Sequence, residues 1–414
     1  MSRATRKQLV GLIAVCVLAG CNDDQQRRAE PRGGASVTAP PQANAQIAAV
    51  RLRPRLGKPS FALLVMNDDG SRSRVVVRAP REGIERLDAP EWSPDGRRLY
   101  FIGVLGEREG DRFVYYESDV FVVDADGGEP RRVTTSGDVR AAVPSPDGKT
   151  LLLERDEHPG ERPFTAGLWL TDGDGGNARR LVEVDEGRLD LDPSWSPDGR
   201  SIAFARCTFA PPGPRGLLEN ACAVYTVSAG GSMLRKLADR SSQPTFSPDG
   251  RRIAFVSDRD EQGLLARGED EEGFANELYV MDADGGEQKR VTRSDGLDES
   301  APAWSPDGSR IAFVSFADHN GRTCAGADCA PNGELYVARA DGTQITRLTR
   351  SRADDQHPTW SPDGARIAFA SGFEFRRDGH PPWLVSISAS GGRVQRIGRF
   401  SGVRDAAWSR VSVR

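Results

Sequence analysis

Histidines and carboxylates are the residues of this 414-residue chain that could bind a metal ion or act as general acids and bases. A lyase site would need several of them held together around a divalent ion. The chain has four histidines, far apart in the sequence, at His158, His319, His357 and His380. The Gly-x-Ser-x-Gly motif of serine hydrolases does not occur. We therefore predict no catalytic residue, no metal site and no cofactor.

The sequence Asp-x-Asp-Gly, which begins at Asp124, Asp172 and Asp282, is a second possible ion site. It has the first ligands of a calcium loop but lacks the later ligands and the glutamate that closes such a loop. Each copy stands between two strand-like segments, where a hairpin needs a tight turn. We interpret all three as turns, and the acidic segment 257–276 as a solvated loop.

The elements that must position these residues repeat about every 50 residues. The repeat contains Ser-Pro-Asp-Gly and then alternating large and small apolar residues, as in Ile253, Ala254 and Phe255. Proline presets the first dihedral of a turn and glycine accepts a positive φ, so the repeat predicts a hairpin corner with a strand on each side. Its six copies occupy residues 92–101, 144–153, 195–204, 246–255, 304–313 and 360–369.

Each repeat has room for four short antiparallel strands, which predicts an all-β fold, the β-propeller. Residues 46–414 hold seven such periods, so we expect seven blades, with six as the alternative. The opening segments at 47–51, 61–66 and 74–78 match a blade without its first strand, and 405–409 matches a first strand alone. We expect these N- and C-terminal strands to pair and close the ring.

The segment that leads into each first strand should line the central channel, on the face that also carries the longer loops, such as those expected at 103–118 and 257–276. Proline stands two residues before the tryptophan position in five copies, and a polar residue usually precedes it. We expect the polar residues to ring the channel mouth and to bind a partner; the alternative is that they only cap strands and bind water. The predicted ring consists of Asp88, Arg140, Asp192, Gln243, Ser300, His357 and Asp405.

The first 45 residues predict export and anchoring. Three basic residues precede an apolar run at 9–18, which has the length of a signal-peptide core and is too short to span a bilayer. The run ends in Leu-Ala-Gly-Cys21, which resembles the bacterial lipobox and implies a signal peptide at 1–20 and lipidation of Cys21. Residues 21–45 are polar and predict a disordered tether. We expect a propeller in the bacterial cell envelope, facing the periplasm or the cell exterior.

Two cysteine pairs stand at the same place in their repeats, between the second and third strands. Export to an oxidising compartment favours two local disulfides, Cys207 with Cys222 and Cys324 with Cys329. A zinc site is the weaker alternative, because no second ligand pair lies near either one.

The repeats W-S-P-D-G-x-x-I-A-F, L-Y-V-x-D-x-D-G-G and x-R-x-T resemble those of the TolB family of the Tol-Pal envelope system, from about residue 47 onward. The resemblance implies a non-catalytic scaffold that binds an envelope protein, and the lipobox-like segment ending in Cys21 adds the membrane anchor. Related blades in lyases and peptidases imply the alternative of a saccharide- or peptide-binding propeller with lyase-like activity. The net charge of −4 argues against a nucleic-acid partner. We expect a monomer.

Overall fold

In the computed structural model, the described residues all belong to one compact unit, Ala43–Arg414. No helix in the described part has the length and apolarity that a membrane crossing needs. The expected signal peptide at 1–20, Cys21, the tether up to residue 44, and the pair Cys324 and Cys329 lie outside it. The structure describes residues 45–53, 60–81, 83–109, 112–157, 165–209, 220–260, 264–267, 271–274, 276–293, 298–316, 332–351, 353–372 and 382–409.

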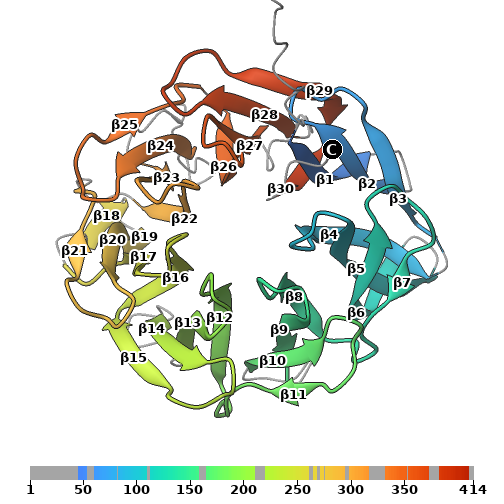
Figure 1. Cartoon of the computed structure of the whole chain (residues 1–414), viewed down its shortest axis with the longest axis horizontal. Coiled ribbons are helices and arrows are strands. Elements are labelled where there is room, and N and C mark those ends of the chain that lie inside the picture. The colour runs from blue at the N-terminus through green and yellow to red at the C-terminus, as the bar shows by residue number, and fades with distance from the viewer. Residues whose placement is uncertain are drawn as a thin grey trace, which may run out of the picture. The chain divides into compact units, whose positions relative to one another are not determined.

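The described strands form five separate four-stranded antiparallel sheets, one eight-stranded sheet and one separate hairpin (Figure 1). The eight-stranded sheet consists of two four-stranded units joined by a parallel contact between Ala166 and Leu189, so the described strands make seven four-stranded units. The first unit contains β30 (Val403–Trp408), β1 (Gln46–Arg53), β2 (Ser60–Asn67) and β3 (Arg74–Ala79). The second and third contain β4 (Ile84–Trp92), β5 (Arg98–Glu109), β6 (Arg112–Asp124) and β7 (Arg131–Arg132), then β8 (Val139–Pro144), β9 (Thr150–Asp156), β10 (Ala166–Asp172) and β11 (Arg179–Arg180). The fourth and fifth contain β12 (Arg188–Trp195), β13 (Ser201–Phe209), β14 (Asn220–Ser228) and β15 (Arg235–Asp239), then β16 (Ser241–Phe246), β17 (Arg252–Ser257), β20 (Glu277–Asp282) and β21 (Lys289–Arg290). The sixth and seventh contain β22 (Glu299–Trp304), β23 (Arg310–Ser315), β24 (Glu334–Arg339) and β25 (Thr346–Arg347), then β26 (Asp354–Trp360), β27 (Arg366–Gly372), β28 (Trp383–Ser388) and β29 (Gln395–Ser401).

The units stand radially around one axis, which confirms the all-β propeller expected from the repeats (Figure 1). The strand that precedes each Ser-Pro-Asp-Gly turn is innermost, as for β12 and β16, and the fourth strand is outermost. Apolar side chains fill the space between neighbouring units: Ala203, Val224 and Leu237 of the fourth unit, for example, pack against Phe255 and Tyr279 of the fifth. The core is therefore a series of layers between sheets.

Each Ser-Pro-Asp-Gly turn is held by side chains of its own serine and aspartate. Ser305 Oγ donates a hydrogen bond to Asp307 Oδ1 (2.5 Å) and accepts one from the backbone N–H of Arg310 (3.0 Å). Asp307 also accepts from the N–H of Ser309 (3.0 Å), and these bonds, chiefly that from Ser305, lower the pKa of Asp307 to about 2. Gly308 has a φ of +68°, which explains glycine at the fourth position.

The tryptophan before each turn links neighbouring units. Trp304 Nε1 donates to the carbonyl oxygen of Thr245 (3.0 Å), and Trp360 Nε1 donates to that of Ala303 (2.9 Å). The acceptor is always the residue before the corresponding position in the preceding unit, and Trp92, Trp195 and Trp408 make the same bond. The tryptophan of the repeat is therefore a structural residue that ties each unit to the one before it.

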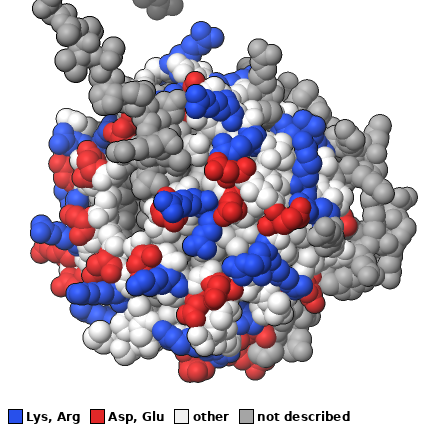
Figure 2. All heavy atoms as spheres, turned by 45° about the vertical axis from the view of Figure 1, so that its right-hand side comes forward, with Lys and Arg blue, Asp and Glu red and all other residues white. Residues whose placement is uncertain are grey.

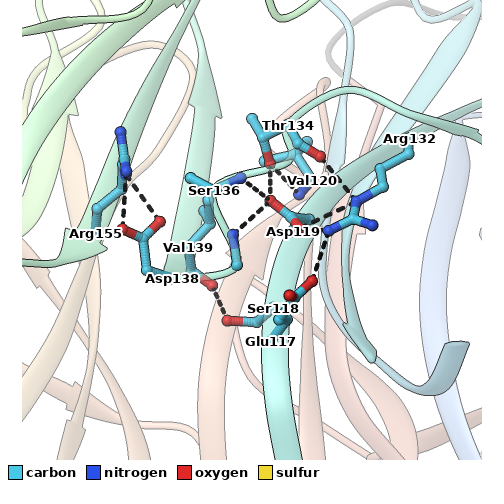
Figure 3. A network of polar contacts seen from close by, with 11 residues as sticks. Glu117, Ser118, Asp119, Val120, Arg132, Thr134, Ser136, Asp138, Val139 and Arg155 are labelled. Carbon is cyan, nitrogen blue, oxygen red and sulfur yellow. Dashed lines mark hydrogen bonds and ion pairs between the residues drawn. The ribbon is translucent and has the colours of Figure 1, made fainter. Parts of the chain in front are cut away.

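A buried carboxylate explains the x-R-x-T part of the repeat (Figure 3). Asp119, at 0% exposure, accepts hydrogen bonds from Thr134 Oγ1 (2.5 Å), from Arg132 Nε (3.1 Å) and from the N–H groups of Ser136 and Gly137. The arginine and threonine thus satisfy an acid that would otherwise be costly to bury. Equivalent sets are Glu277 with Arg290 and Thr292, and Glu334 with Arg347 and Thr349.

The two ends of the described chain share a sheet. β1 pairs with β30 in antiparallel register, with Ile47 opposite Trp408 and Val50 opposite Asp405. The N–H of Ser409 also donates to the carbonyl oxygen of Gln46 (2.8 Å). β1 therefore has a partner on both sides, as the expected terminal pairing requires.

Two segments interpreted as loops contain strands instead. In the segment 103–118, β5 and β6 continue far beyond the sheet and pair as far as Glu109 and Arg112. In the acidic segment 257–276, β18 (Leu264–Arg267) and β19 (Glu271–Phe274) form a hairpin of their own. The prediction of plain loops was wrong there, because a charged composition does not prevent two backbone segments from pairing.

Candidate functional site

The predicted ring residues lie within the innermost strands and follow the wall around the axis (Figure 1). Arg140, Asp192 and His357 are exposed, whereas Asp88, Gln243 and Ser300 are half-buried. For Asp405 the structure describes the backbone, which lies opposite Val50. These positions lie inside the innermost strands and not in loops at their ends. They therefore line the inside of the propeller, and we call them the inner wall. By strand the set is Asp88 in β4, Arg140 in β8, Asp192 in β12, Gln243 in β16, Ser300 in β22, His357 in β26 and Asp405 in β30.

A β-bulge accompanies the proline of these strands. Asp192, Gln243 and His357 have φ between 51° and 55°, and the strand register shifts beside each of them. Proline has no N–H for the ladder, so the strand must bulge where it stands. In β4 and β22 the corresponding residues are Ala89 and Ala301, so Asp88 and Ser300 lie one residue too early. The predicted set therefore combines two strand positions, a difference that the place of each proline in the sequence already shows.

The bulges are tied together by hydrogen bonds between units. The Glu154 carboxylate accepts from the N–H of Asp192, and the Asp192 carboxylate accepts from the N–H of Gln243. Gln243 Oε1 in turn accepts from the N–H of Ala301 (2.7 Å). Each side chain thus satisfies a strained backbone position in the next unit. Asp192 and Gln243 therefore have a structural role whatever else they contact.

Several ion pairs lie at the innermost strands β4 and β8 and at β9, the strand beside β8. Arg86 Nε lies 2.5 Å from Asp88 Oδ2, and Arg140 lies between Glu154 (3.5 Å) and Asp156 (3.1 Å). Loss of hydration among the surrounding protein atoms raises the pKa of Asp192, although part of its side chain is exposed to solvent. Burial likewise raises the pKa of Glu154 to about 7, and the nearby Asp192 charge adds to this. The Glu154 carboxyl group is therefore expected to lose its proton near neutral pH.

The raised pKa of Glu154 predicts a stability that falls as pH rises. Between the ordinary value near 4.5 and about 7, the folded state binds a proton that the unfolded state has lost, so unfolding becomes easier with increasing pH. The loss should be on the order of 2–3 kcal/mol across this window. Glu154→Gln should remove the Glu154 part of this slope in urea unfolding measured from pH 4.5 to 7.5. The part due to Asp355, whose pKa burial also raises to about 7, should remain.

Asp156→Asn is the matched control, because it removes the more exposed carboxylate beside the same Arg140. It should leave the slope in place. A wild-type slope that persists in the Glu154→Gln protein would contradict the assignment.

In the described residues, no three His, Cys, Asp or Glu side chains are grouped so as to hold a metal ion. His357 belongs to the wall, whereas His158, His319 and His380 lie outside the described residues. Cys207 and Cys222 form a disulfide between β13 and β14 (S–S 2.04 Å). On the face shown in Figure 2, Lys and Arg alternate with Asp and Glu and no extended field of one sign appears.

A hollow of about 560 Å³ lies elsewhere, on the face of the Ser-Pro-Asp-Gly turns, between the units that begin with β8 and β12. We expected function on the opposite face, so the sequence interpretation missed it. The available signal was Thr150, which stands where four other repeats carry an arginine: Arg98, Arg252, Arg310 and Arg366.

Relatives share parts of the propeller. No protein-family model matches the chain. A TolB homologue of Chlorobium luteolum is 30% identical over 152 residues, which cover 30% of this chain and 32% of the homologue. The chain is a β-propeller that is similar to a TolB homologue over this segment. An uncharacterized peptidase of Bacillus subtilis, YuxL, is 27% identical to the chain over 221 residues, which cover 47% of the chain and 31% of the peptidase. The propeller thus spans about a third of the length of each of these two relatives.

Solved structures of low sequence identity share the propeller fold of this chain. The propeller domain of the trilobed protease of Pyrococcus furiosus superposes with a TM-score of 0.56 at 14% identity, covering 86% of this chain and 95% of that domain. An oligogalacturonate lyase of Vibrio parahaemolyticus superposes with a TM-score of 0.57 at 14% identity, covering 86% and 87% of the two chains. The same architecture therefore occurs in proteins of different activities, and the fold alone does not assign one here.

Proposed function

We propose that this chain is a non-catalytic scaffold of the bacterial envelope, anchored through a lipid on Cys21, that binds a protein partner at the inner wall of its propeller. The observation that carries the proposal is the set of exposed polar side chains on the innermost strands: Arg140, Asp192 and His357. They project from strands held in place by the hydrogen bonds between units. Because the strands that carry these polar side chains are rigid, they can bind a protein segment with a small loss of conformational entropy.

Photo-crosslinking in intact cells tests both parts of this proposal. A crosslinking amino acid at position 357 should capture one protein in the membrane fraction, and the same group at Met233, 79% exposed on an outer turn, should capture at least ten-fold less. In the Cys21→Ser protein, both the chain and the captured product should leave the membrane fraction. Equal capture at positions 357 and 233 would contradict binding at the wall, and retention of the Cys21→Ser protein in the membrane fraction would contradict the anchor.

The alternative is a saccharide- or peptide-binding propeller with lyase-like activity. Metal analysis of the purified full chain distinguishes the two, because a lyase of this architecture would need a bound divalent ion. A stoichiometric ion would overturn the scaffold proposal.

A further inference from the structure

Two units cover the tryptophan of the next unit with an arginine. The Arg252 guanidinium lies 4.9 Å from the ring centroid of Trp304 and donates to the carbonyl oxygen of Gly308 (2.8 Å). The Arg310 guanidinium lies 4.8 Å from the ring centroid of Trp360. It likewise donates to a glycine of the next turn, the carbonyl oxygen of Gly364 (3.0 Å). Both tryptophans are buried, so the arginine completes a cation–π site between units.

The same place between the β8 and β12 units has no such arginine. Thr150 follows its Ser-Pro-Asp-Gly turn at the same offset as Arg252 and Arg310, and its side chain is too short to reach the next unit. Trp195 is only half-buried, and no guanidinium of the described residues is placed over its ring. The hollow of about 560 Å³ lies here and is lined by Thr150, Trp195 and Gly199, the residues that correspond to one arginine site.

The charges around the hollow favour a cation. Asp147, Asp172 and Asp198 line it, against the single guanidinium of Arg179. Hydrogen bonds from Ser145 and Ser196 lower the pKa of Asp147 and Asp198, so both are ionised at neutral pH. Arg179 already donates to the carbonyl oxygen of Ala229 (2.7 Å). The hollow therefore offers an indole face, a glycine carbonyl and an excess of negative charge.

We propose that this hollow binds the guanidinium of an arginine side chain presented by a partner polypeptide. The proposal rests on the proposed function, since it names one feature of the partner that such a scaffold would bind. The chain's own Arg252 and Arg310 show the geometry: the guanidinium lies over the indole ring while one of its N–H groups donates to the glycine carbonyl of the turn. Arginine fits better than lysine because its planar cation can stack and donate at the same time.

The test uses N-acetyl-arginine methylamide and the full chain labelled with 5-fluorotryptophan. The ¹⁹F resonance of Trp195, assigned with Trp195→Phe, should shift saturably with one site. The citrulline analogue, of similar shape but uncharged, should bind at least ten-fold more weakly, and the lysine analogue should bind several-fold more weakly. Equal binding of the arginine and citrulline probes would overturn the proposal, because the hollow would then not recognise a cation.

Two reciprocal variants make the test specific to this hollow. Thr150→Arg should fill the hollow from within, lower probe affinity at least ten-fold and leave the unfolding midpoint unchanged or higher. Arg252→Thr should open a second hollow at Trp304 and raise the stoichiometry from one to two. Unchanged probe binding by the Thr150→Arg protein would contradict the proposal. Crosslinking from position 357 does not depend on this hollow, so its failure would contradict the proposed function, whereas absence of probe binding would contradict only the arginine site.

Discussion

Arg206→Met is expected to lower the free energy of unfolding by about 3–5 kcal/mol. Arg206 Nε and Nη2 donate to the two oxygens of Asp190 at 2.6 and 2.7 Å, and Nη2 also donates to the carbonyl oxygen of Glu183. Asp190 is fully buried, and burial raises its pKa even beside this arginine. Methionine would fill the space of the arginine stem but would leave the carboxylate without a cation. Urea unfolding with the disulfide intact measures the loss.

The double variant Asp190→Leu/Arg206→Met separates the cost of an unpaired charge from the value of the pair. It should recover most of the lost stability, because apolar side chains can replace a buried ion pair at little cost. Lys236→Met is the exposed control: Lys236 pairs with Asp239 at 2.8 Å on the surface, where water screens the pair, so it should leave stability nearly unchanged. A double variant as unstable as Arg206→Met alone would show that the lost stability comes from packing and not from an unpaired charge.

Trp408→Ala is expected to destabilise the propeller by about 3–5 kcal/mol, the usual cost of truncating a buried tryptophan. Trp408 is 6% exposed and packs with Ile47, Leu64 and Leu384 between the first and seventh units. Its Nε1 also donates to the carbonyl oxygen of Thr359 (3.1 Å). The variant would weaken the sheet that joins the two ends of the chain. Hydrogen exchange should therefore accelerate in β1 before it does in the β16 unit.

Trp408→Phe is the matched control, because the chain itself carries Phe246 at the equivalent position of another unit. It keeps most of the packing and loses the indole hydrogen bond, so it should cost roughly 1 kcal/mol beyond the small change in buried area. If Trp408→Ala and Trp408→Phe were equally unstable, the hydrogen bond would outweigh the packing. If Trp408→Ala left exchange in β1 unchanged, terminal pairing would not contribute to stability.

The turn-and-strand repeat was predictable from the sequence because its causes are local. Ser305, Asp307 and Gly308 act within six residues of one another, through hydrogen bonds and a positive φ that need no other part of the chain. Short strands follow from the alternation of apolar residues around each turn. The all-β propeller follows from repeating that unit, because a single sheet of this kind cannot bury its apolar faces alone.

The positions around the axis were predictable only in part. Polar residues before each proline indicated the inner strands, but the proline bulge places Ala89 and Ala301, not Asp88 and Ser300, at the strained positions. The hydrogen bonds that use Asp192 and Gln243 join different units. Such bonds depend on how two sheets pack against each other. The local sequence pattern does not predict that packing.

By itself, the sequence determined the period, the turns and the strands of this protein, because backbone preferences act over a few residues. Only the tertiary structure decided that Thr150 leaves the face of Trp195 open, that burial raises the pKa of Glu154 to about 7, and that Arg206 neutralises Asp190. In each case one residue acts on another across a sheet or between two sheets. Contact, burial and dielectric environment at such places are properties of the packed ring, and they arise only once the units have assembled.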